Sequence, residues 1–128
     1  MVKNIVIFLI LFVVASCNSQ SGTKAITKEN IQKGETLFRN VGCTTCHSVS
    51  GEVLYGPPLN TVYNSVVEVI HDGKKRSVKA TREYIHQSIQ NPDFDKVDGF
   101  QSKKMPKPTL SEEDMDYIID YLESLNSK

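Results

Sequence analysis

Two cysteines and a histidine lie within one five-residue segment, Cys43-Thr44-Thr45-Cys46-His47. The pattern Cys-x-x-Cys-His is typical of the attachment site of a c-type haem. The two thiols can add across the vinyl groups of a haem to form thioethers, while the adjacent imidazole coordinates the iron as its proximal ligand. The motif therefore predicts one covalently bound haem c, attached through Cys43 and Cys46, with His47 as an iron ligand.

The same cysteine spacing also occurs in zinc sites and in dithiol redox sites. A structural zinc site needs four ligands, and the only other cysteine of the chain is Cys17, next to an N-terminal apolar run. A dithiol redox site is expected near a βαβ pattern, whereas the flanks here indicate a helix followed by a loop. His47, directly after the second cysteine, favours the haem over both alternatives.

The N-terminus has the pattern of a secretory signal peptide. One positive charge, Lys3, precedes the apolar run 5–15. This run is shorter than the roughly 20 apolar residues that a membrane-spanning helix needs, so an uncleaved anchor is the weaker alternative. We expect residues 1–16 to be removed during export.

The end of this segment, Val14-Ala15-Ser16-Cys17, resembles the lipobox of bacterial lipoproteins, in which the cysteine is lipidated. The alternative is ordinary cleavage after Ser16, which would leave Cys17 as a free thiol outside the cytoplasm. Several acyl chains give stable anchoring where one chain gives only reversible binding. We expect a lipoprotein held on the periplasmic side of a membrane, with residues 17–26 as the lipidated cysteine and a short flexible tether.

Charge and length limit the classes of partner and the size of the domain. The chain has 15 basic and 15 acidic side chains, and loss of Lys3 with the signal peptide leaves fourteen and fifteen. This balance gives no electrostatic support for nucleic-acid binding. Residues 27–128 would form one small domain with a marginal apolar core, to which a buried haem would add apolar volume.

Amphipathic helices are predicted at both ends of this domain. The first runs from the N-cap Thr27 to about Asn40, and the last from Ser111 to Leu125, where Ser111 and an aspartate three residues later resemble a capping box. Gly34 interrupts the first helix at a cost of about 1 kcal/mol relative to alanine. Close contact with another helix, most simply the last one, would compensate.

A hairpin and a third helix are predicted between them. Asp72-Gly73 is a strong hairpin-turn pattern between alternating valines and predicts a two-stranded excursion. The third helix runs from about Thr81 to Gln90, before Asn91-Pro92. Tyr84, Ile85, Ser88 and Ile89 share one arc of it, which leaves His86, like His71 beside the turn, as a surface residue.

Taken together, these residues resemble class I cytochrome c over about the last hundred positions. They are most similar to the cytochrome c domain that is fused to subunit II of some haem-copper oxidases. The motifs that carry this resemblance are Gly56-Pro57-Pro58-Leu59, Tyr63, Asp72-Gly73, Tyr84-Ile85, Ser88-Ile89, Asn91-Pro92, Gly99-Phe100 and Met105-Pro106. The resemblance implies an all-α class I cytochrome c fold, with the N- and C-terminal helices packed together around a covalently attached haem and a small β-hairpin excursion.

The resemblance also implies two further roles at the haem. Met105, in the loop before the last helix, would be the second axial ligand of the iron, on a loop stiffened by Pro106 and Pro108. The alternative is that Met105 only fills a gap in the core. The carbonyl group of Pro57 would accept a hydrogen bond from the proximal His47 ring, which fixes the orientation of that ring.

Two filled axial positions would make the protein an electron carrier and not an enzyme, with a positive reduction potential. The expected partners are a terminal oxidase or reductase and a quinol-oxidising complex of a respiratory chain. The alternatives are a fixed haem subunit of a larger redox complex, or a peroxidase or gas sensor in which Met105 dissociates. Basic residues flank Met105 and also surround the hairpin. They form either a solvated face or a docking surface for an acidic partner. The residues beside Met105 are Lys103, Lys104 and Lys107, and those around the hairpin are Lys74, Lys75, Arg76, Lys79 and Arg82.

Overall fold

The structure is a computed structural model that describes residues 25–126. The predicted signal peptide 1–16, the lipidation site Cys17 and most of the tether 17–26 lie outside the described residues. Within residues 25–126, none of the helices has the length and apolar character needed to cross a membrane.

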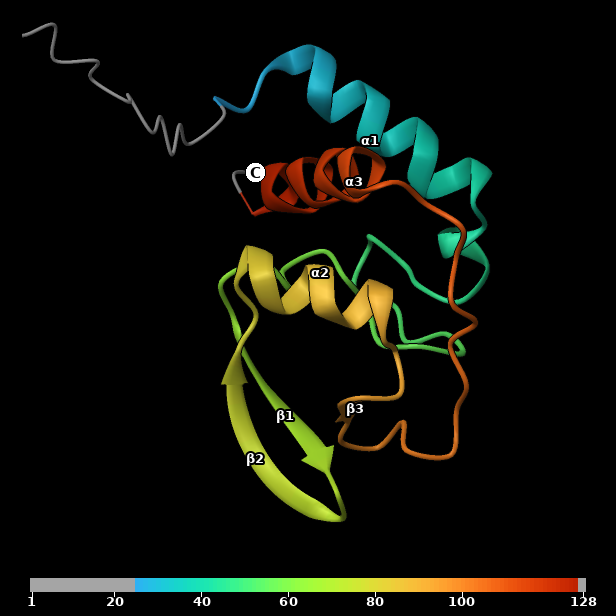
Figure 1. Ribbon diagram of the computed structural model, residues 1–128, viewed down its shortest axis with the longest axis vertical. Helices are drawn as coiled ribbons and strands as arrows, with labels where there is room; N and C mark the ends of the chain where they lie inside the picture. Colours follow the sequence, from blue (N-terminus) through green and yellow to red (C-terminus); the bar gives the residue numbers. More distant parts are fainter. Residues whose placement is uncertain (1–24, 127–128) are drawn as a thin grey trace, which may run out of the picture.

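Three α-helices and a small sheet make up the described chain. In order, the elements are α1 (Lys28–Asn40), a 3₁₀ turn (Cys43–Thr45), β1 (Val66–His71), β2 (Lys74–Lys79), α2 (Arg82–Gln90), β3 (Lys96–Val97) and α3 (Glu112–Leu125). In Figure 1, α1 lies across α3 at one end of the molecule, α2 lies below them, and the β1–β2 hairpin projects from the opposite end. The crossed terminal helices, the third helix and the projecting hairpin are the arrangement that the resemblance implies.

The crossing of α1 and α3 explains the glycine in the first helix. Helix α1 begins after Thr27, whose hydroxyl accepts a hydrogen bond of 3.1 Å from the amide of Asn30. A Cβ atom on Gly34 would lie 1.9 Å from the carbonyl oxygen of Tyr117 in α3. The predicted close contact between the two terminal helices is confirmed, and it depends on the missing side chain.

Helix α3 begins at the predicted capping box. The Ser111 hydroxyl accepts a 3.1 Å bond from the Asp114 amide, while the Asp114 carboxylate accepts one of 3.3 Å from the Ser111 amide. The Ser111 hydroxyl also donates a 2.7 Å bond to the Asp114 carboxylate, and this bond, together with that from the Ser111 amide, holds the pKa of the Asp114 carboxyl below its usual value. The helix then contributes most of the core, with Ile118, Ile119 and Leu122 almost fully buried.

The hairpin turn and the third helix also lie where the sequence predicts them. Asp72 and Gly73 both have positive φ angles, 48° and 74°, which a two-residue hairpin turn of this type requires. Thr81 caps α2 by accepting a bond from the amide of Tyr84. The sheet has an additional strand, however, because β3 pairs antiparallel with β1, in the order β2-β1-β3.

One ionic cluster connects the three helices. Arg82, at the start of α2, pairs with Asp116 at 3.0 Å and with the buried Asp120, both on α3. Asn30 of α1 donates a 3.1 Å bond to the same Asp120 carboxylate. Burial opposes the charge on Arg82, but its bonds to the two aspartates outweigh that effect and raise its pKa. The cluster fixes how the helices that surround the site are placed.

Candidate functional site

A mainly apolar cavity lies between α2, α3 and the loops that follow the 3₁₀ turn and β3. Helix α2 lines it with the four residues that the sequence places on one arc, Tyr84, Ile85, Ser88 and Ile89. Neither His71 nor His86 belongs to the lining; both are partly exposed and pair with carboxylates. His47 is therefore the histidine, among the described residues, that reaches the cavity.

The Cys-x-x-Cys-His segment forms one wall of the cavity as a tight turn. It follows Gly42, which lies between the end of α1 and this turn and has a φ angle of 89°, a conformation that glycine adopts readily. The amides of Cys46 and His47 both donate to the Cys43 carbonyl, at 3.1 and 2.9 Å. Neither cysteine is in a disulfide, and both line the cavity, where burial raises the pKa of the Cys43 thiol. Two thiols held this way suit addition to the two vinyl groups of one haem.

The ring of His47 is fixed by the loop that follows it. Its Nδ1 atom lies 2.8 Å from the carbonyl oxygen of Pro57, and because a carbonyl can only accept, Nδ1 carries the proton. The other ring nitrogen, Nε2, is left free to bind a metal. This is the contact that the resemblance implies for Pro57.

Gly56 lies so close to the same ring that any side chain there would require the ring or the loop to move. A Cβ atom there would lie 2.6 Å from Cε1 of His47 and 3.2 Å from the Cys46 carbonyl oxygen. The Gly56 amide also donates a 2.8 Å bond to that carbonyl group. This role of Gly56 is not evident from the sequence, since a glycine before a proline indicates only a turn.

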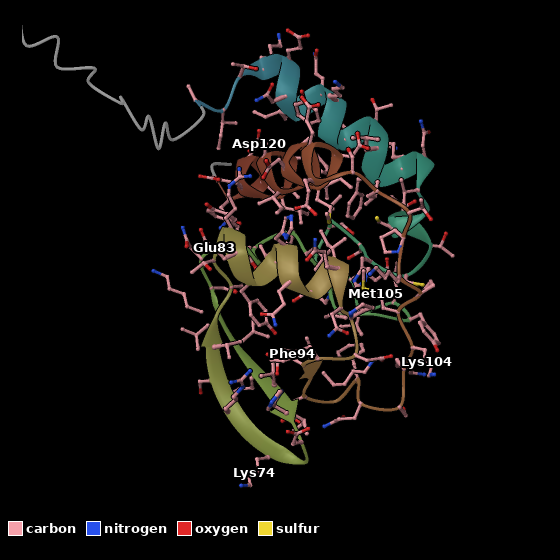
Figure 2. The ribbon with its side chains drawn as sticks, viewed as in Figure 1. Lys74, Glu83, Phe94, Lys104, Met105 and Asp120 are labelled. Carbon is pink, nitrogen blue, oxygen red and sulfur yellow. The ribbon has the colours of Figure 1, made fainter. Side chains whose placement is uncertain are left out.

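Met105 lines the cavity from a different part of the chain, the extended segment between β3 and α3. Its side chain is partly buried, and Pro108 of the same segment also lines the cavity. In Figure 2, Met105 lies near the C-terminal end of α2, while the neighbouring Lys104 lies at the outer edge of the molecule. The structure thus brings Met105 to the same cavity as His47, Cys43 and Cys46.

The cavity also has a charged wall that sequence reasoning did not predict. Asp95 lines it with a side chain that is only 3% exposed, and accepts two bonds from Arg76 of β2, at 2.8 and 2.9 Å. Nδ1 of His71 lies 3.0 Å from the same carboxylate. Burial, and to a smaller extent this carboxylate, raise the pKa of Tyr84, so its hydroxyl stays protonated in the lining.

These residues fit a covalently attached haem c. Two thiols, one imidazole with its Nδ1 already bonded, and one thioether surround a cavity whose remaining lining is mostly aliphatic and aromatic. The same residues do not form a zinc site, because residues 25–126 contain no group of three or more His, Cys, Asp or Glu side chains able to hold a metal. The haem would be held by Cys43, Cys46 and His47, and the Met105 thioether could supply a further ligand to its iron.

Comparisons with known proteins agree with this site. The family model of cytochrome c matches residues 31–126. Among solved structures, cytochrome c from Rhodothermus marinus is similar, with 25% identity, a TM-score of 0.55, and coverage of 80% of this chain and 82% of that one. An engineered form of that cytochrome, bound to a carbene intermediate, has 25% identity, a TM-score of 0.53, and coverage of 82% and 84%. No curated protein matches.

Proposed function

The chain belongs to the cytochrome c family, and on that basis we propose that it is a membrane-tethered monohaem carrier that moves single electrons between respiratory-chain components on the extracytoplasmic side. Covalent attachment of haem c and electron transfer are properties of the family, and Cys43, Cys46 and His47 supply the attachment motif. The proposal adds the axial ligand Met105, the membrane anchor and the respiratory partners.

The observation that carries the proposal is that His47 and Met105 line one cavity. When bound, haem c supplies an iron that can change its oxidation state by one electron. The chain's part would be to hold this iron with the His47 imidazole and the Met105 thioether, so that no position would remain open for a substrate, and to surround the site with apolar side chains. A methionine ligand and an apolar surrounding both favour a positive reduction potential.

Absorption spectroscopy and a redox titration of the exported holoprotein test this function. The ferric protein should show the weak near-infrared band of sulfur bound to iron, and the midpoint potential should be positive. Met105→Ala should abolish the band and lower the potential, whereas Met115→Leu, a volume-conserving change of a core methionine, should leave both unchanged. A strongly negative wild-type potential would contradict the proposal.

The membrane tether is proposed from the sequence pattern at Cys17. Intact mass of the protein recovered from membranes should show both a haem and a lipid modification, and Cys17→Ala should release a soluble holoprotein with an unchanged spectrum. Recovery in a constant ratio with other subunits would instead favour the alternative, a fixed haem subunit of a larger redox complex.

The distribution of charge supports an acidic partner that docks beside Met105. Near the hairpin, Lys75 pairs with Asp98 at 2.7 Å and Arg76 pairs with Asp95, so part of that positive charge is neutralised. By contrast, Lys103, Lys104 and Lys107 form no ion pair with the described residues. The exposed side chains of Val53, Leu54 and Tyr55 lie on the loop that reaches the Met105 segment. A basic and partly apolar face of this kind suits a transient complex with an acidic protein.

A further inference from the structure

Tyr55 connects the two segments that supply the proposed iron ligands. It immediately precedes Gly56, whose amide is bonded to the Cys46 carbonyl, so it is fixed to the haem-attachment segment. Its hydroxyl accepts a hydrogen bond of 3.4 Å from the amide of Lys104, the residue before Met105. The ammonium group of Lys103 lies 4.8 Å from the centre of the Tyr55 ring. All four side chains, those of Tyr55, Lys103, Lys104 and Met105, line the cavity.

This contact is important because few polar contacts hold the Met105 segment, although Leu110 at its end packs against the core. In the described structure, the bond from Lys104 to Tyr55 is the only hydrogen bond made by residues 104–110. Pro106 and Pro108 have no amide hydrogen to donate, and Lys107 forms no ion pair within residues 25–126. The preceding residues are better held, since the Lys103 amide donates a 2.9 Å bond to Phe100.

We propose that Tyr55 is a positioning residue: it latches the Met105 segment to the haem-attachment loop and thereby limits how readily Met105 leaves the site. This inference rests on the proposed function in one respect, that Met105 is an iron ligand. The latch would keep the sixth position closed to small neutral nitrogen ligands, of which imidazole is the simplest probe. Tyr55 is not itself an iron ligand in this proposal and acts through the segment that it holds.

The size of the effect follows from the contacts that each substitution removes. Tyr55 is 47% exposed and its hydrogen bond is long, so its hydroxyl contributes little. Loss of the hydroxyl alone should increase the open population, the fraction of molecules in which Met105 has left the iron, about threefold. Removing the ring as well also eliminates the cation–π contact with Lys103, and the increase should reach about tenfold. Because imidazole binds only the open form, its apparent dissociation constant should fall by the same factors.

The test is a titration of the ferric holoprotein with imidazole, followed by the loss of the near-infrared sulfur-to-iron band. We expect the apparent dissociation constant to fall about threefold in Tyr55→Phe and about tenfold in Tyr55→Ala. Thr109→Ala is the control on the same segment, since Thr109 is exposed and does not line the cavity, and it should bind imidazole as the wild type does. Tyr55→Phe preserves the shape of the side chain, so the test remains possible if Tyr55→Ala fails to fold.

The possible failures are distinguishable. If the wild-type ferric protein lacks the near-infrared band, Met105 is not the ligand, and both the proposed ligation and the latch are overturned. If the band is present and the Tyr55 variants bind imidazole as tightly as the wild type, the latch alone is wrong. An equal gain in Thr109→Ala would also contradict it, because the effect would then come from any change in the segment.

Discussion

At the scale of single residues, the site depends on how closely the chain approaches the His47 ring. The ring is held on one side by the Pro57 carbonyl, 2.8 Å from Nδ1, and on another by the backbone of Gly56. The orientation of the proximal ligand is thus set by two consecutive residues that contribute no side-chain chemistry.

Gly56→Ala tests this arrangement. The added Cβ would meet Cε1 of His47 at 2.6 Å, so either the ring or the loop must move. We expect a loss of about 1–3 kcal/mol of unfolding free energy in the holoprotein, together with a shift of the midpoint potential. Denaturant unfolding and redox titration measure the two effects. Ser50→Ala, an exposed change on the same loop, should alter neither, and a Gly56→Ala protein that matched it would refute the steric argument.

At the scale of elements, the crossing of α1 over α3 is a second place where a Cβ atom cannot be accommodated. Gly34→Ala should improve the intrinsic helix propensity of α1 by about 1 kcal/mol. The Cβ, however, would lie 1.9 Å from the Tyr117 carbonyl oxygen and would force the helices apart. We expect a net destabilisation of about 2 kcal/mol by thermal or denaturant unfolding. In the same helix, the exposed Thr36→Ala should change stability by less than about 0.5 kcal/mol.

The start of α3 gives the second prediction at this scale. Ser111→Ala removes one half of the capping box, so the helix should lose about 1 kcal/mol of stability. The same change removes the hydroxyl bond that is the larger cause of the lowered pKa of Asp114 and leaves the bond from the residue 111 amide, so Asp114 should titrate closer to its usual value. Calorimetry measures the first effect and carboxyl NMR the second. An unchanged Asp114 titration would show that the cap is not formed in solution.

For the whole molecule, the pH dependence of stability follows from exposed carboxylates with lowered pKa values. The bond from Lys75, and then that from Gln101, hold the pKa of Asp98 below its ordinary value of 3.8. A carboxylate of this kind stabilises the fold above its unfolded pKa, and the contribution is lost as the pH falls through the lower folded pKa. Asp98→Asn should therefore be less stable than the wild type at neutral pH, and the difference should vanish in acid below pH 3.8. A difference independent of pH would exclude the ion pair as its cause.

At the scale of the whole surface, the lysines that form no ion pair with the described residues predict where anions approach. Ferricyanide is a small anionic oxidant, so its reaction rate reports the local potential at the point of electron exit. The double substitution of Lys104 and Lys107 with Gln should slow oxidation about tenfold at low ionic strength and flatten its salt dependence. The matched double substitution of Lys74 and Lys79, on the hairpin, removes the same charge and should have a smaller effect. Equal effects of the two pairs would mean that the face beside Met105 is not preferred.

Local patterns were sufficient to predict most of the elements. The three helices and their caps at Thr27, Thr81 and Ser111 lie within a residue of the predicted positions, because capping and apolar periodicity depend on residues three or four apart. The hairpin turn depends only on Asp72-Gly73. The short strand β3 was not predicted, since two residues carry no periodicity and Lys96–Val97 becomes a strand only by pairing with β1.

The sequence by itself determined the haem attachment motif and the helix that lines the cavity with Tyr84 and Ile85, because each depends on short-range spacing. Its resemblance to class I cytochrome c implied the fold class. The proposed anchor at Cys17 also comes from the sequence alone. Only the tertiary structure decided the close approach of Gly56 to His47, the pairing of the buried Asp95 carboxylate with the exposed Arg76, and the contact of Tyr55 with Lys104, 49 residues away. These contacts join residues from different parts of the chain, and no local pattern encodes which distant segments will meet.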